Sequence, residues 1–134
     1  MKKIIIGLFL MAYSCYNYGQ TSLVFCTSVE KDGYCYFNNN KFIAQQDSAT
    51  SKIFMQIKST PPSTIGATKV TYKIYTVNAK GEEAMVTSID QNVAPDWMFV
   101  WMPYSFDAGS KYDVKIYNEL NQLVCSKSLE LLKW

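Results

Sequence analysis

The 134-residue sequence contains neither histidine nor arginine. Without histidine there is no ordinary Ser–His or Cys–His pair to activate a nucleophile. Without arginine there is no rigid guanidinium fork to hold a carboxylate or a phosphate. The chain also lacks a glycine-rich phosphate loop and a calcium-binding loop. These absences predict a protein that is not an enzyme and that carries no cofactor.

All 13 basic residues are lysines, and two of them, Lys2 and Lys3, stand before the apolar run IIIGLFLMAY at residues 4–13. That run is too short to cross a bilayer, which takes about 20 residues in a helix. A positive start followed by such a run is typical of a secretory signal peptide. Its removal would leave 11 lysines against 11 acidic residues, a net charge of zero. A neutral chain is not expected to bind nucleic acid or an anionic lipid surface.

Two cleavage sites fit the stretch MAYSCYNYGQTS that follows. A cut after residue 19 would make residues 1–19 the signal and would release a periplasmic or secreted chain that begins at Gln20. This start resembles many exported chains of Gram-negative bacteria. A cut before Cys15 would make residues 1–14 the signal. It resembles bacterial lipoproteins, in which the cysteine carries a lipid, and in that case the lipid would be the protein's one attachment to a membrane.

Three cysteines remain in the body of the chain, Cys26, Cys35 and Cys125. Export would place them where disulfides form, and an odd number leaves at least one thiol unpaired. We consider a Cys26–Cys35 bridge around the turn EKDG, and we interpret Cys125 as a small buried hydrophobe. Three cysteines without histidine do not match the spacing of a zinc site, so we predict no metal.

Segments of alternating or β-forming residues fill the rest of the chain, and no window keeps a helical period. Turn signals such as Asp32–Gly33 and Pro61–Pro62 separate the segments. Seven or eight short strands at spacings of about 8–12 residues favour a sandwich or small barrel, so we predict one all-β domain over residues 22–134. The expected strands are residues 22–29, 34–37, 52–58, 68–77, 84–89, 96–106, 111–118 and 122–131.

The segment FDAGSKYDVKIYN places a turn with Gly109 before Tyr112 and an alternating strand. This resembles the penultimate strand of fibronectin type III and other immunoglobulin-like sandwiches, over residues 106–131. The resemblance implies an antiparallel β-sandwich in which the hydroxyl of Tyr112 bonds back to the backbone of the corner. Val114 stands where antibody domains have the inter-sheet cysteine. Such scaffolds host many unrelated functions.

The segment DWMFVWMPY is apolar on both faces of its expected strand. Alternation puts Trp97, Phe99 and Trp101 on one face and Tyr104 with its apolar neighbours on the other. A sandwich strand usually exposes one face to water, so a loop of the same domain, a partner protein or a sugar should cover the second. Two tyrosines before residue 40 could extend this surface. The candidate binding residues are Trp97, Phe99, Trp101, Tyr104, Tyr34 and Tyr36.

The tripeptide Asp47–Ser48–Ala49 resembles the O-glycosylation motif of exported proteins in some Gram-negative bacteria, with Ser48 as the acceptor. A plain Asx-type turn explains the same residues.

Three functions follow in order of preference. The first is a non-enzymatic, exported immunoglobulin-like domain that binds an unidentified protein at a Gram-negative cell envelope or serves there as an accessory structural subunit. The second is a carbohydrate-binding module that stacks a glycan on its aromatic side chains. The third is a small extracytoplasmic hydrolase built on clustered carboxylates.

The intact mass of the protein purified from its native host should correspond to a chain that begins at Gln20 without added acyl groups. A mass that fits a start at Cys15 plus acyl chains would instead identify a lipoprotein. The same spectrum would show any glycan on Ser48.

Overall fold

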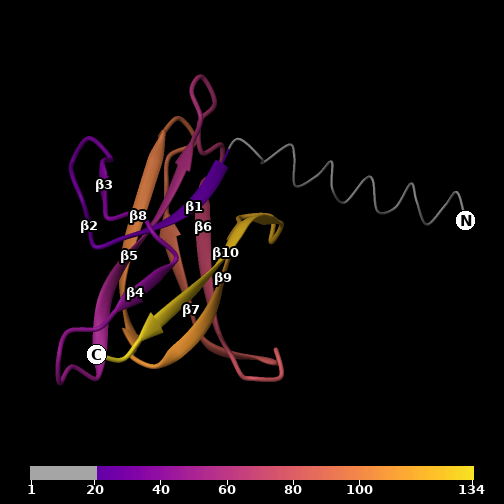
Figure 1. Cartoon of the computed structure of the whole chain (residues 1–134). Helices are drawn as coiled ribbons and strands as arrows, with labels where there is room; N and C mark the ends of the chain where they lie inside the picture. Colours follow the sequence, from indigo (N-terminus) through magenta and orange to yellow (C-terminus); the bar gives the residue numbers. More distant parts are fainter. Residues whose placement is uncertain (1–20) are drawn as a thin grey trace, which may run out of the picture.

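The computed structural model describes residues 21–134, which fold into two packed β-sheets and a small separate hairpin, with no helix among them (Figure 1). The predicted signal peptide and Cys15 lie outside the described residues. The strands are β1 (Thr21–Cys26), β2 (Ser28–Val29), β3 (Cys35–Tyr36), β4 (Lys41–Ile43), β5 (Thr50–Ser59), β6 (Lys69–Val77), β7 (Glu83–Asn92), β8 (Phe99–Asp107), β9 (Ser110–Asn118) and β10 (Leu123–Leu132).

One sheet has three strands in the order β1-β5-β8, and the other has five in the order β4-β10-β9-β6-β7. All neighbours are antiparallel except β4, which runs parallel to β10. After the hairpin, the chain crosses between the sheets from β4 to β5, from β5 to β6, from β7 to β8 and from β8 to β9. This arrangement is an immunoglobulin-like sandwich, so the fold predicted from the sequence is confirmed.

The core lies between the two sheets and comes from the alternation within the strands. Ile53, Met55 and Ile57 of β5 point inward and are fully buried. Val114 and Ile116 of β9 meet them from the opposite sheet. Because successive side chains of a strand point to opposite faces, each of these strands supplies every second residue to the core.

The observed strands differ from the prediction at three main places, the first of which is the short strand β4, which was not predicted. The predicted first strand, residues 22–29, ends in the sheet at Cys26, because the chain then leaves as the β2–β3 hairpin before it joins the other sheet as β4. The predicted strand 96–106 begins only at Phe99. Trp97 lies in the preceding loop, where its carbonyl accepts a hydrogen bond from the N–H of Ile65 at 2.7 Å.

The corner between β8 and β9 is organised by Tyr112. Its hydroxyl accepts a hydrogen bond from the N–H of Asp107 at 2.8 Å, and its ring packs edge-on against Phe106 at 4.8 Å between centroids. Gly109 has a φ of +84° in the turn, a conformation that glycine adopts without steric cost. Desolvation raises the pKa of the Tyr112 hydroxyl, which therefore stays protonated at neutral pH.

Tyr112→Phe should lower the free energy of unfolding by about 1 kcal/mol, because it removes the hydrogen bond that the part-buried Tyr112 hydroxyl accepts from the N–H of Asp107. Tyr117→Phe on the same strand is the control, since no hydrogen bond joins that hydroxyl to residues 21–134. Urea denaturation of both variants measures the difference. Equal stabilities would show that the corner hydrogen bond contributes nothing.

Candidate binding groove at the edge of β8

Among residues 21–134, strand β8 is an edge strand, because it pairs with β5 on one side and with no strand on the other. The carbonyl of Met98, just before the strand, accepts a hydrogen bond from the N–H of Ser59 on the β5 side at 2.9 Å. In an antiparallel pair the backbone groups of alternate residues point to the same side. The N–H and C=O groups of Phe99 and Trp101 therefore point outward. Pro103, which has no N–H to donate, belongs to the same outward row.

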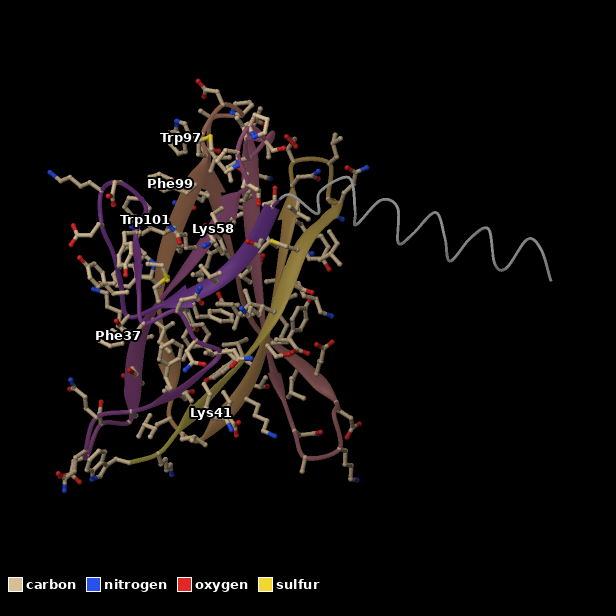
Figure 2. The ribbon with its side chains drawn as sticks, turned by 45° about the horizontal axis from the view of Figure 1, so that its top comes forward. Phe37, Lys41, Lys58, Trp97, Phe99 and Trp101 are labelled. Carbon is tan, nitrogen blue, oxygen red and sulfur yellow. A yellow bond between two sulfur atoms is a disulfide. The ribbon has the colours of Figure 1, made fainter. Side chains whose placement is uncertain are left out.

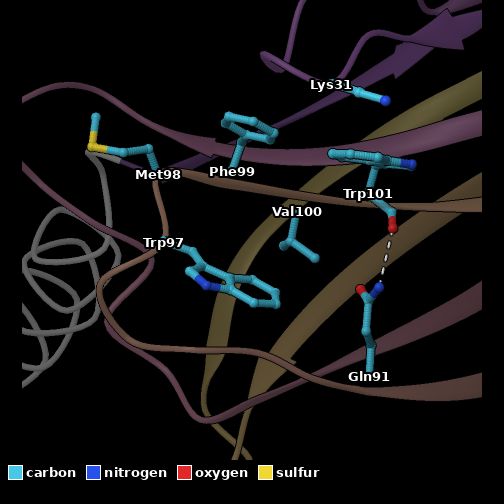
Figure 3. A pocket seen from close by; sticks show the side chains of 7 residues that line it. All are labelled: Lys31, Gln91, Trp97, Met98, Phe99, Val100 and Trp101. Atoms are coloured by element: carbon cyan, nitrogen blue, oxygen red, sulfur yellow. Dashed lines mark hydrogen bonds between the residues drawn. The ribbon is translucent and has the colours of Figure 1, made fainter.

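A groove of about 560 Å³ follows this open edge over the first half of the strand. Figure 3 shows the rings of Phe99 and Trp101 on one side of β8 and the side chains of Trp97 and Val100 on the other. The side chains of Trp97 and Met98 remain 47% and 36% exposed. The groove is lined by Lys31, Gln91, Trp97, Met98, Phe99, Val100 and Trp101.

The amide of Gln91 connects the two sheets at this edge. Its Oε1 accepts a hydrogen bond from the buried hydroxyl of Tyr72 at 2.7 Å, and its Nε2 donates to the carbonyl of Trp101 at 3.1 Å. Burial raises the pKa of Tyr72, so the hydroxyl remains a donor. The side chain of Gln91 thus hydrogen-bonds to one of the outward-facing backbone carbonyls of β8, that of Trp101.

The β2–β3 hairpin covers part of the outer face of the three-stranded sheet. A disulfide joins Cys26, at the end of β1, to Cys35 in β3. The fully buried Gln56 donates its Nε2 to the carbonyl of Gly33 at 2.6 Å, while its Oε1 has no hydrogen-bond partner among residues 21–134. Gly33 rests on the ring of Phe99, where a Cβ atom would lie 2.7 Å from the ring. A loop of the same domain therefore covers this second apolar face.

The structure separates the six aromatic residues that the sequence suggested as one surface. Phe99 and Trp101 stack with their centroids 5.7 Å apart, and Trp97 lies beyond them at the same end of the molecule (Figure 2). The predicted alternation was wrong for Trp97, because the strand begins after it and its side chain lies on the opposite side of β8 from Phe99 and Trp101 (Figure 3). Tyr104 faces the core and packs edge-on against Phe106 at 5.0 Å.

Tyr34 and Tyr36 lie on the hairpin and contact each other edge-on at 4.8 Å. Neither lines the groove. Phe37, the next residue, is 77% exposed (Figure 2). The hairpin therefore presents a second, separate group of aromatic side chains.

The surroundings of Ser48 and Cys125, two other positions considered from the sequence, indicate no reaction at either side chain. The hydroxyl of Ser48 donates a hydrogen bond to the carbonyl of Thr50 at 2.6 Å within a turn, and its glycosylation stays a prediction. Cys125 has no disulfide partner within residues 21–134, and desolvation raises the pKa of its thiol to about 12. At neutral pH this thiol carries almost no thiolate and is a poor nucleophile.

Residues 21–134 contain no group of three or more histidine, cysteine, aspartate or glutamate side chains placed to hold a metal ion. Within the same range no helix is long and apolar enough to span a membrane.

Sequence reasoning did not include four of the groove residues. Met98 and Val100 were expected on the other face of the strand, and Lys31 and Gln91 come from the hairpin and from the opposite sheet. The edge itself left a signal in the sequence. A proline within an otherwise apolar strand, here Pro103, indicates an edge strand, since proline cannot donate to a neighbour on its N–H side.

Comparison with known proteins leaves the family open, because no protein-family model and no curated protein matches the chain. Among solved structures, an immunoglobulin-like protein from Pseudomonas aeruginosa is similar, with a TM-score of 0.48, 16% identity, and coverage of 83% of this chain and 90% of that one. A superoxide reductase (neelaredoxin) from Ignicoccus hospitalis has a TM-score of 0.41, 12% identity, and coverage of 72% and 75%. These likenesses are weak, so the fold assignment rests on the strand order and the tyrosine corner.

Gly33→Ala should destabilise the protein more than Gly81→Ala, by about 1 kcal/mol or more, because its Cβ would collide with the stacked ring of Phe99. The two glycines have similar φ angles, +91° and +82°, and nothing lies within 4 Å of a Cβ at Gly81. The pair therefore separates the collision from backbone strain. Thermal unfolding measures the difference, and equal losses would mean that the hairpin does not press on Phe99.

Proposed function

We propose that this chain is an exported, non-enzymatic binding domain that recognises a partner protein of a Gram-negative cell envelope through the groove beside β8. The observation that carries the proposal is an apolar groove, lined by three aromatic rings, at a strand edge that no other strand of the described part of the chain covers. Protein interfaces are enriched in tryptophan, tyrosine, phenylalanine and methionine, and the groove contains three of these four types.

The export of the chain is proposed from the sequence, in which Lys2 and Lys3 precede a short apolar run. The Cys26–Cys35 disulfide supports it, since structural disulfides are rare in the reducing cytosol. The immunoglobulin-like fold fits a domain of this kind, because its conserved feature is a rigid sandwich whose loops and edges are free for recognition.

Carbohydrate binding remains the second candidate, and the structure offers it less support than a protein partner. A sugar needs a flat, accessible ring face on which to stack. Phe99 is covered on one side by Gly33 and stacks with Trp101. The half-exposed Trp97 is then the best available platform in the groove.

The proposal predicts a position-specific cross-link in the native host. A benzophenone amino acid placed at Met98, in the groove, should join the chain to one discrete envelope protein under ultraviolet light. The same photoreactive residue at Met85, on the outer part of β7, is the matched control, because both side chains are exposed methionines on edge segments, 36% and 54% accessible. Adducts that are absent at both positions, or identical at both, would contradict a groove partner.

Trp97→Ala should reduce the Met98 adduct strongly, since truncating a central interface aromatic typically costs about 2 kcal/mol, roughly 30-fold in affinity. Trp134→Ala, which removes another exposed tryptophan far along the chain, should leave the yield unchanged. If the protein partner is absent but glycans quench the tryptophan fluorescence of the chain and not of Trp97→Ala, the carbohydrate candidate replaces the first.

A further inference from the structure

We propose that the groove binds an extended segment of its partner as an additional strand, hydrogen-bonded to the outer edge of β8 at Phe99 and Trp101. This inference rests on the proposed function and specifies the form of the partner. Its argument comes from the backbone of β8, from the walls of the groove, and from the charge at one rim.

The backbone of β8 presents, at regular spacing, groups that no strand among residues 21–134 pairs with. The backbone N–H and C=O groups of the even-numbered residues point toward β5, as the hydrogen bond from the N–H of Ser59 to the carbonyl of Met98 shows. The N–H and C=O of Phe99 and the N–H of Trp101 therefore point toward the groove. An extended chain is the one backbone conformation that can satisfy donors and acceptors that alternate at this spacing.

The side chain of Gln91 already acts as a partial substitute for a strand. Its Nε2 bonds the carbonyl of Trp101, and its own Oε1 is held by Tyr72. That carbonyl is thereby satisfied whether or not a partner is bound. The incoming segment needs to pair with the remaining outward groups of Phe99 and Trp101 only.

Pro103 limits the length of the pairing. It lies in the outward row but has no N–H, so a continuous ladder cannot extend past it. The groove covers the same limited stretch, since its lining includes residues up to Trp101 and none beyond. The occupant is therefore short. Two paired strands advance by the same rise, about 3.3 Å per residue, so the lined stretch of β8 matches about five residues of the occupant.

The two walls define the side chains of the occupant. Residues that point to one side of the added strand meet Trp97 and Val100, and this wall calls for apolar side chains. Residues that point to the other side meet Phe99, Trp101 and Lys31 (Figure 3). Lys31 is exposed and forms no ion pair within residues 21–134, so a carboxylate on this side of the segment complements it.

The same lysine disfavours a second copy of the chain as the occupant. Two β8 strands paired about a two-fold axis would form one continuous sheet, with both copies of Lys31 on the same face beside the junction. Like charges brought together in this way oppose association. A different protein with an acidic, alternating segment has no such conflict.

The experiment selects linear heptapeptides from a phage-displayed library on the purified mature chain with its disulfide intact. Clones are kept only if Trp97→Ala abolishes their binding and Trp134→Ala does not. The synthetic peptides are then methylated at one backbone nitrogen at a time, and each affinity is measured by isothermal titration.

Strand addition predicts a period of two in this series. N-methylation at alternate residues should weaken binding by about tenfold, because it removes a hydrogen bond and crowds β8, while methylation at the residues between should change it by less than about twofold. Binding should also slow hydrogen exchange at the amides of Phe99 and Trp101. In Lys31→Glu, an acidic peptide should lose about threefold or more in affinity, and in the control Lys80→Glu it should lose none.

Three results would overturn strand addition. Peptides that need Trp97 but show no period under N-methylation would bind by side chains alone, which leaves the proposed function standing. Failure to select any Trp97-dependent linear peptide, with the Met98 cross-link intact, would mean that the partner presents a folded surface. A concentration-dependent dimer in sedimentation, lost in Trp97→Ala, would identify a second copy as the occupant.

Discussion

Strand β8 has apolar side chains on both faces, although only one face looks into the sandwich, and much of the architecture around it answers this constraint. Val100 and Phe106 enter the core in the ordinary way. The opposite face is covered by the β2–β3 hairpin. In the sequence this hairpin lies between β1 of the three-stranded sheet and β4 of the five-stranded sheet. The disulfide and the hydrogen bond from Gln56 to Gly33 hold this hairpin down. A disulfide typically stabilises the folded state by about 2–4 kcal/mol.

The hairpin leaves the lateral edge of β8 open, and the two halves of this edge differ in their residues. Beyond the midpoint, Pro103 removes a donor, as natural edge strands do to prevent unwanted pairing. Before the midpoint, the backbone groups are flanked by aromatic side chains on both faces and by one lysine. A protein that only needed to avoid aggregation would not gain from an apolar groove at this place. The contrast between the two halves is the strongest structural argument for recognition there.

The sequence predicted the sandwich because its signals are local. The predicted segments overlap nine of the ten strands at least in part and miss only β4, and the glycine before Tyr112 identified the corner. The groove was not predictable in the same way. It joins Lys31 from the hairpin, Gln91 from the opposite sheet and residues of β8, and a period along one strand carries no information about which other segments approach it. Tyr104 was misplaced for a related reason, since alternation gives the face of a strand but not which face is covered.

The position of the disulfide in the chain affects which of the three body cysteines pair during folding. Cys26 and Cys35 are nine residues apart near the start of the sandwich, whereas Cys125 is in the last strand. In a chain that is threaded through a membrane from its beginning, the first two meet before the third arrives. Once Cys125 has folded into β10, desolvation raises the pKa of its thiol to about 12, so little thiolate forms there at neutral pH. In an exported chain, the order of the residues would therefore favour the Cys26–Cys35 pair over a pair with Cys125.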